Sequence, residues 1–230
     1  MIKFFKSNKS TLIILGFIIL IGAYLRISGI LTNSFAFTYD VGRDMLRVHE
    51  IVFMHKIPLI GQTTGLGGLY YGPWWYYILT PPFIISGGNP QGIAFFMALC
   101  GLAVILLSFY LGRIISGNRL GLIVAAIVSF SQATIGLSSQ IWNPNIAPLF
   151  VLLIFIILLR LERLKRKFLS LTIIGFLLGL LIDTEIVFGL LFSLGTILLL
   201  VIFGKKKLLY KSSLGLFLGL LITFLPRIFF

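Results

Sequence analysis

The chain has 230 residues and a net charge of +13, with 59% hydrophobic and only 11% charged residues. A soluble domain carries about a quarter of its residues as charged side chains, so this composition excludes a soluble globular protein and predicts a polytopic membrane protein. The excess of lysine and arginine then reflects topology, because these residues collect beside membrane spans on the cytoplasmic side. No nucleic-acid-binding signature interrupts the apolar runs, so we expect no nucleic-acid partner.

The N-terminus carries Lys3, Lys6 and Lys9 ahead of an apolar run from Thr11 to Leu25. That run is longer than the apolar core of a cleaved signal peptide, and no small-residue cleavage site follows it. We therefore expect a retained signal anchor in the cell (plasma or inner) membrane, with the N-terminus in the cytoplasm.

Seven stretches are apolar and long enough to be spans, since a spanning helix needs about 20 mostly apolar residues. They cover residues 11–30, 91–112, 120–137, 146–160, 169–184, 186–203 and 213–229. A further stretch, 70–86, contains Pro73, Pro81 and Pro82 and is short for a span. If it does not cross, most basic residues fall at cytoplasmic ends, and if it crosses, most of them move outside, against the positive-inside rule.

These observations predict an all-α polytopic membrane protein, with about seven transmembrane helices forming one module over residues 1–230. Its long first outer loop, residues 31–90, carries interfacial helices, and 70–86 is an interfacial or re-entrant segment beside a cavity. Of the six acidic residues, only Glu162 lies on the cytoplasmic side. The outer ones are Asp40, Asp44, Glu50, Asp183 and Glu185. The chemistry is therefore expected on the outer face.

The first part of the outer loop predicts an amphipathic helix over residues 40–54 that lies flat on the membrane. Its apolar face consists of Val41, Met45, Val48 and Val52, and its charged face of Asp40, Arg43, Asp44, Arg47 and Glu50. Ion pairs on a solvated face explain Arg43, Arg47 and Glu50. Asp40 is at the junction of span and helix, where it either caps the helix or points into the cavity as a base.

A glycine-rich segment over residues 61–68 follows and predicts a tight irregular loop. Six aromatic residues come directly after it, within eight positions. They are Tyr70, Tyr71, Trp74, Trp75, Tyr76 and Tyr77. An interfacial aromatic belt explains most of them, and stacking against a sugar ring or a lipid headgroup is the functional alternative. His49 and His55 match no standard metal-ligand spacing.

In their order and spacing these segments resemble the membrane glycosyltransferases of the GT-C superfamily. The similarity is strongest to the bacterial branch related to protein O-mannosyltransferases and lipid A aminoarabinose transferases, and it runs over residues 11–230. The motifs that carry it are TYDVGRDMLRVHE (38–50), YYGPWWYYILTPP (70–82), GGNP (87–90), LGRIISGNRLG (111–121) and WNPN (142–145).

The resemblance implies transfer of a sugar from a polyprenyl-phosphate donor to an acceptor hydroxyl on a glycan, lipid or protein. It also implies an essential aspartate at the start of the first outer loop, where Asp40 stands, followed here by Val41 in place of the usual Glu. Asp40 is then the base that takes the hydroxyl proton, and basic groups stabilise the departing phosphate. Candidate donor-phosphate or acceptor contacts are Arg43, Asp44, Arg47, Lys56, Tyr71 and Glu185. A divalent metal at Asp40 stays an alternative.

Two further features of the family bear on this chain. Its members run to several hundred residues with further spans, so we expect this chain to be an N-terminal part, truncated at its C-terminus. A basic residue usual before the aromatic segment is replaced by Gly68-Leu69-Tyr70, which moves the phosphate ligand elsewhere. Glu185 faces either the cavity or solvent, and Asn143 and Asn145 predict a turn and a helix cap.

Two other functions fit the composition. A transporter or flippase for a lipid-linked or small anionic substrate would use the outer acids to bind its cargo. Such proteins usually show internal repeats and polar residues at the midplane of the bilayer, whereas the centres of these spans are almost purely apolar. A non-catalytic assembly subunit is the third alternative.

Overall fold

The computed structural model describes residues 8–65, 67–203 and 206–229, with the backbone alone for Phe203 and residues 206–212. In these ranges the regular structure is helical, apart from one antiparallel bridge in the loop before the third helix. The helices are α1 (Lys9–Leu31), α2 (Tyr39–Met54), α3 (Trp74–Ile85), α4 (Pro90–Phe130), α5 (Gln132–Ser139), α6 (Ala147–Arg160), α7 (Lys167–Thr184), α8 (Ile186–Phe203) and α9 (Lys206–Ile228), with short 3-10 helices η2 (Asn143–Ile146) and η3 (Leu161–Arg163).

Among the described residues, four helical segments are long and apolar enough to cross a membrane. They are Lys9–Leu31, Pro90–Phe130, Asn143–Arg163 and Lys167–Thr184. Ile186–Ile202 and Ser213–Ile228 are also apolar but shorter. The all-α class is confirmed for the described residues, and the long apolar helices are consistent with a multi-pass membrane protein. Lys3 and Lys6, which belong to the predicted cytoplasmic end, lie outside the described residues.

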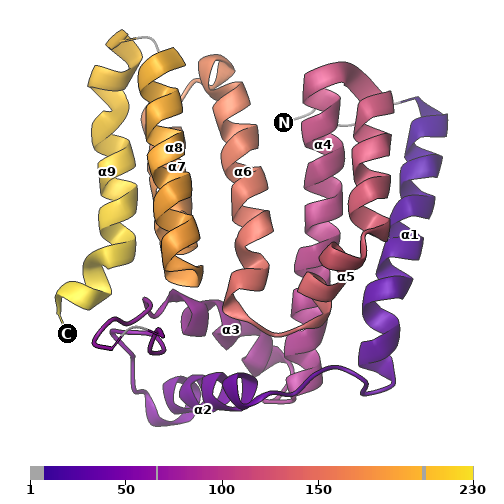
Figure 1. Cartoon of the computed structure of the whole chain (residues 1–230), viewed down its shortest axis with the longest axis vertical. Helices are drawn as coiled ribbons and strands as arrows, with labels where there is room; N and C mark the ends of the chain where they lie inside the picture. Colours follow the sequence, from indigo (N-terminus) through magenta and orange to yellow (C-terminus); the bar gives the residue numbers. More distant parts are fainter. Residues whose placement is uncertain (1–7, 66, 204–205, 230) are drawn as a thin grey trace.

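Helix α4 is divided by a sharp turn. Ser116 and Gly117 leave helical geometry, with φ of −147° and +82°, and the chain reverses there so that two antiparallel arms stand side by side (Figure 1). Glycine adopts a positive φ at little cost. The arms approach closely below the turn, since a Cβ on Gly112 would lie 3.0 Å from the Cα of Gly121. The predicted turn between residues 112 and 120 is therefore present inside α4.

The predicted span 120–137 is interrupted, because Ser131 is extended and separates α4 from α5. The free carbonyl groups at the end of α4 are bound by Arg26 of α1, which is 1% exposed. Its guanidinium donates to the carbonyl oxygens of Ser129 (3.0 Å) and Val128 (3.1 Å). A cation at a helix C-terminus satisfies orphan carbonyls and opposes the helix dipole. Arg26 thus explains why a continuous apolar stretch breaks at this position.

Helices α7 and α9 pack through two facing glycine motifs, GFLLG (175–179) and GLFLG (215–219). A Cβ on Gly219 would collide with the carbonyl oxygen of Thr172, and those on the other three glycines would also meet the opposite helix. Small residues four positions apart let two helix backbones approach in a membrane, where van der Waals packing replaces the hydrophobic effect. The motifs explain the close pairing of α7 with α9.

Helices α2 and α3 lie across one end of the upright helices (Figure 1). α3 contains Pro81 and Pro82 and has only 12 residues. A helix of that length is too short to span a membrane, which agrees with the short helix predicted for 70–86. The buried side chains of α3 include Trp75 and Leu79, and they join the main core with Val48 of α2. This end of the molecule is therefore a packed cap on the bundle, and it carries the residues considered next.

Candidate functional site

The site begins where the chain enters α2. Thr38 is the N-cap, and its hydroxyl oxygen accepts the Val41 N–H at 3.4 Å. The cap interpretation of Asp40 is therefore wrong, since Asp40 is inside the first turn of the helix. An acidic side chain in that turn is stabilised by the positive end of the helix dipole. Helix α2 itself, predicted over residues 40–54, is confirmed to within one residue.

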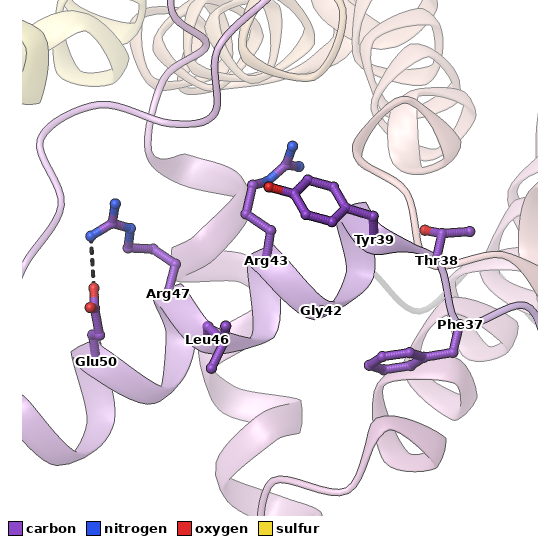
Figure 2. Close-up of a pocket in the computed structure, with 8 residues that line it drawn as sticks. All are labelled: Phe37, Thr38, Tyr39, Gly42, Arg43, Leu46, Arg47 and Glu50. Carbon is purple, nitrogen blue, oxygen red and sulfur yellow. Dashed lines mark hydrogen bonds and ion pairs between the residues drawn. The ribbon is translucent and has the colours of Figure 1, made fainter.

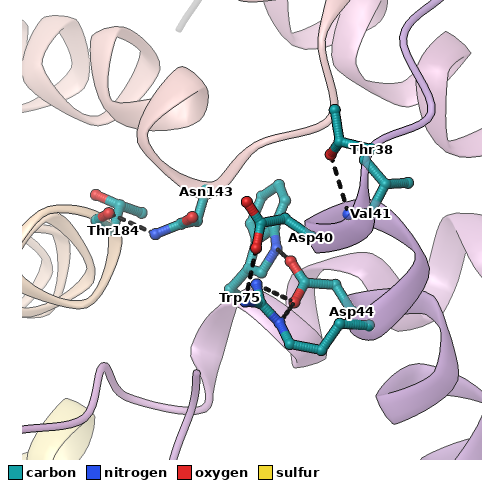
Figure 3. A network of polar contacts seen from close by, with 8 residues as sticks. Thr38, Asp40, Val41, Asp44, Trp75, Asn143 and Thr184 are labelled. Carbon is teal, nitrogen blue, oxygen red and sulfur yellow. Dashed lines mark hydrogen bonds and ion pairs between the residues drawn. The ribbon is translucent and has the colours of Figure 1, made fainter. Parts of the chain in front are cut away.

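Arg43 joins two carboxylates of the same helix. Its Nη1 donates to Asp40 Oδ1 at 2.7 Å, while Nη2 and Nε donate to Asp44 Oδ1 at 2.7 and 2.9 Å. Figure 3 shows this network, with Asp40 and Asp44 on successive turns of α2. The Asp40 side chain keeps 48% of its surface exposed, whereas that of Asp44 keeps 3%. One guanidinium therefore fixes the orientation of an accessible and an inaccessible carboxylate.

Asp44 is on the buried face of α2, so its predicted place on the charged face is wrong. Its Oδ2 accepts the Trp75 indole N–H at 2.8 Å. Burial raises the pKa of Asp44, although Arg43 and Trp75 act in the opposite direction. The sequence held a signal for this position, because residues 41, 44, 45 and 48 share the spacing of one helix face. Asp44 was nevertheless assigned to the charged face, because a carboxylate usually lies in a solvated position.

The neighbouring groups have well-defined charge states. Burial lowers the pKa of Arg43, but the hydrogen bonds and charges of Asp44 and Asp40 outweigh it, so the pKa is raised overall. Burial, with the charge of Asp44, raises the pKa of Tyr76 to about 12. At neutral pH the cluster therefore combines a cationic Arg43 with a neutral Tyr76.

A cavity of about 250 Å³ adjoins Asp40, between the start of α2 and the loop that leads to η2. Its lining includes Thr38, Asp40, Val41, Gln140, Ile141 and Trp142. The resemblance placed a base at this position, and the structure shows its carboxylate at a cavity wall. Gln140 and Trp142 were not predicted as site residues, because nothing in the local sequence shows that this loop returns to α2.

Two buried asparagines hold that loop. Asn143 donates to the Thr184 carbonyl oxygen at 2.6 Å, and Asn145 donates from its side chain to the Gln140 carbonyl oxygen at 3.1 Å. The Asn145 N–H also binds the Trp142 carbonyl oxygen at 3.0 Å. Figure 3 shows the Asn143–Thr184 pair across from Asp40. The predicted turn is present as the single 3-10 turn η2, whereas the predicted helix cap is wrong, since neither asparagine caps η2 or α6. The two amides instead fix the loop that presents Trp142.

A second, open pocket of about 590 Å³ lies along α2 (Figure 2). Its lining is Phe37, Thr38, Tyr39, Gly42, Arg43, Leu46, Arg47 and Glu50. Arg43 and Arg47 are four residues apart and therefore lie on one side of the helix. The predicted ion pair of Arg47 with Glu50 is present at 2.7 Å, with both side chains partly exposed. Thr38 lines both pockets, so they meet at the N-terminus of α2.

The other predicted contacts lie elsewhere. Burial, together with the negative charge of Glu185, raises the pKa of Tyr71. Neither belongs to the lining of the two pockets. Lys56 follows the C-terminus of α2, whose 16 residues span about 24 Å. The structure therefore brings Arg43 and Arg47 to the site around Asp40, but not Lys56, Tyr71 or Glu185.

Asp183 forms an ion pair with Arg227 of α9 and is 1% exposed, so it is no ordinary charge of an outer turn. Gly72 packs directly on its carboxylate, where a Cβ would collide with it. Trp74 next to this pair donates to the Thr223 carbonyl oxygen at 2.9 Å. The pair and the indole bind α3, α7 and α9 together, which indicates a structural role.

The side chains around Asp40 do not favour the alternative in which Asp40 binds a divalent metal. Among the described residues, no group of three or more His, Cys, Asp or Glu side chains gathers. Asp40 and Asp44 both bind the guanidinium of Arg43. His49 packs on the rings of Phe53 and Phe83, with centroids 4.6 and 6.5 Å away. The residues around Asp40 therefore do not fit a metal centre.

Comparison of the chain with protein-family models, with curated proteins and with solved structures found no match. The resemblance to the GT-C glycosyltransferases consequently stays an expectation. The site combines a partly exposed carboxylate in a cavity, a loop that brings Gln140 and Trp142 to the same cavity, and two guanidinium groups in the adjoining pocket.

Proposed function

We propose that the protein is a membrane glycosyltransferase, which moves a sugar from a polyprenyl-phosphate donor to an acceptor hydroxyl. One observation carries the proposal. The Asp40 carboxylate lies in a cavity, while Arg43, its ion-pair partner, lines the adjoining pocket together with Arg47. A transfer from a phosphate to a hydroxyl needs a base on one side and stabilisation of a departing phosphate on the other.

Asp40 has the geometry of the base. Its Oδ1 accepts from Arg43, and among the hydrogen bonds of the described residues none engages Oδ2. In the reaction the acceptor oxygen forms a bond to the anomeric carbon while the bond from that carbon to the phosphate oxygen breaks. Asp40 takes the hydroxyl proton, and the electron pair of the broken bond leaves with the phosphate. The fixed guanidinium keeps the carboxylate oriented for this step.

The leaving phosphate is assigned to the two arginines. A guanidinium has five N–H donors, and Arg43 uses three of them on Asp40 and Asp44. Arg47 has a side chain that is 51% exposed, and an exposed ion pair such as its contact with Glu50 is worth at most about 1 kcal/mol. Both cations are therefore available to a phosphate oxygen, which binds guanidinium in a forked geometry.

The same pocket suits a polyprenyl chain. Phe37, Tyr39 and Leu46 are 56%, 85% and 69% exposed, and all three line it. Contiguous exposed apolar side chains mark binding sites for ligands or membranes. Cationic and apolar groups on one wall match an isoprenoid that ends in a phosphate.

We place this site on the outer face of the cell membrane, in a chain that crosses seven times with its N-terminus in the cytoplasm. The crossings are α1, the two arms of α4, α6, α7, α8 and α9. Support comes from the charges: the start of α1, the turn of α4 and the α6–α7 connection are all at the end opposite α2 (Figure 1). Basic residues at that end include Lys9, Arg113, Arg119, Arg160 and Arg163. Such clusters face the cytoplasm.

The test is sugar transfer in membranes that contain the chain and radiolabelled polyprenyl-phosphate sugars. Asp40→Asn removes the base with little change in volume, and Glu185→Gln makes the same chemical change at a carboxylate that lines neither pocket. We expect transfer by the wild type and by Glu185→Gln, and transfer that is slower by about 100-fold or more by Asp40→Asn. Transfer by Asp40→Asn at the wild-type rate would rule out the role of Asp40. Wild-type membranes that use no donor would favour a transporter or flippase.

A further inference from the structure

We infer that the 250 Å³ cavity beside Asp40 is an acceptor subsite for a carbohydrate, with Trp142 as the surface on which a sugar ring stacks. The inference rests on the proposed function and adds the class of acceptor, a glycan hydroxyl rather than a lipid or protein hydroxyl. It depends on three observations, which are the direction of the lining side chains, their chemistry and the rigidity of the loop.

The loop directs two side chains into the same space. Gln140 (φ −117°, ψ 135°) and Trp142 (φ −153°, ψ 138°) are in extended geometry. Successive side chains of an extended segment point to opposite sides. Ile141 packs into the core at the base of the cavity and is 4% exposed, whereas Trp142 is 49% exposed. Gln140 is also exposed, so an amide and an indole share the cavity lining with Asp40.

The four polar or aromatic groups of the lining match a polyol. A sugar ring has a C–H face that carries partial positive charge and packs on the negative face of an indole. Its hydroxyl rim needs both donors and acceptors, which the Gln140 amide supplies. The Thr38 hydroxyl accepts the Val41 N–H and retains its own proton to donate. Asp40 accepts from the hydroxyl that reacts.

Size and rigidity agree with this occupant. The cavity volume of about 250 Å³ is enough for one sugar ring. An acyl chain needs a lining that is apolar throughout, which these side chains do not provide. Asn143 and Asn145 hold the loop through buried hydrogen bonds, so little order has to be gained when the ligand binds.

The arrangement also separates the two substrates. The donor pocket lies along α2, and the acceptor cavity lies between α2 and the loop, with Thr38 in the lining of both. Asp40 belongs to the cavity and Arg43 to the pocket. The base is therefore on the acceptor side of the ion pair and the phosphate ligand on the donor side, as the displacement requires.

Transfer kinetics test the inference, with one donor at saturation and three acceptor series: oligosaccharides, hydroxyl-bearing peptides and diacylglycerol. We expect transfer to saccharides. Trp142→Ala should raise the KM for the saccharide about tenfold and leave the KM for the donor unchanged, and Trp142→Phe should recover most of the loss. Tyr24→Ala, an exposed aromatic of α1 that lines neither pocket, is the control and should change neither constant.

The outcomes separate the two proposals. Transfer only to peptide or to diacylglycerol, or an unchanged saccharide KM in Trp142→Ala, would overturn the inference while leaving glycosyl transfer intact. No transfer by the wild type from any donor would overturn both. Saccharide quenching of tryptophan fluorescence is the second measurement, because Trp142 is the most exposed of the three tryptophans. The quenching should disappear in Trp142→Phe, and quenching that persists would contradict the assignment.

Discussion

Asp44→Asn is the substitution for which the structure makes the sharpest stability prediction. The carboxylate accepts three N–H groups, two from Arg43 and one from Trp75. Asparagine keeps one acceptor oxygen and replaces the other by an amide, which is a donor. In either orientation of the amide, a donor faces another donor in a site that is closed to water.

The expected loss is about 2 kcal/mol of unfolding free energy, because an unsatisfied buried donor costs about 1–3 kcal/mol. It stays below the 3–5 kcal/mol of a fully broken buried ion pair for two reasons. Arg43 retains Asp40 as a partner, and burial already disfavours the charge of Asp44, as its raised pKa shows. Glu50→Gln is the matched control, since its exposed pair with Arg47 is worth at most about 1 kcal/mol.

Unfolding in detergent micelles, followed by tryptophan fluorescence, measures the effect. For a chain of this length 1 kcal/mol shifts Tm by about 2–4 °C, so Asp44→Asn should melt about 4–8 °C below the wild type. Trp75→Phe should cost less in the Asp44→Asn background than in the wild type, because it removes one of the opposed donors. The reasoning is refuted if Asp44→Asn and Glu50→Gln melt together, or if the two substitutions at Asp44 and Trp75 are additive.

Three further results are expected. Gly219→Ala should separate α7 from α9 and lower Tm. In the control Gly195→Ala the new Cβ meets nothing within 4 Å, so Tm should stay unchanged or rise slightly. Equal effects of the two substitutions in thermal melts would contradict the close packing of α7 on α9. The pKa of Asp44 in the folded protein is raised above its ordinary value of 3.8, so protonation of Asp44 favours the folded state. This contribution to stability is complete below pH 3.8 and is lost as the pH rises through the folded pKa. Melting curves from pH 3.5 upward should show this fall in the wild type and lack it in Asp44→Asn; parallel curves would contradict it. A cysteine at Ser116 in a Cys100→Ala background should react with an impermeant reagent only from the cytoplasm, and reaction from outside would overturn the proposed orientation.

Local pattern was sufficient for much of the fold. The 3.6-residue spacing of apolar residues located α2, and the prolines and short length of 70–86 predicted a helix shorter than a span, as α3 is. The turn at Gly117 followed from charged and glycine-rich sequence between two apolar runs. These features depend on neighbouring residues alone, so one sequence is enough to find them.

Contacts distant in the sequence were not accessible in this way. The break at Ser131 depends on Arg26, more than one hundred residues earlier, and the buried place of Asp44 depends on Trp75. The glycine motifs of α7 and α9 stand in the sequence, but no local feature says which helix each one meets. For the site, Asp40, Arg43 and Arg47 follow from one helix, whereas Gln140 and Trp142 needed the tertiary fold.

Donor binding and turnover measured on the same purified protein test the central claim most directly. A general base contributes about 100-fold or more to the rate, and Asp40 is assigned to the acceptor side, away from the phosphate. The account predicts that Asp40→Asn binds a polyprenyl-phosphate sugar with the Kd of the wild type while its turnover falls about 100-fold or more. Turnover close to that of the wild type, with the donor still bound, would contradict it.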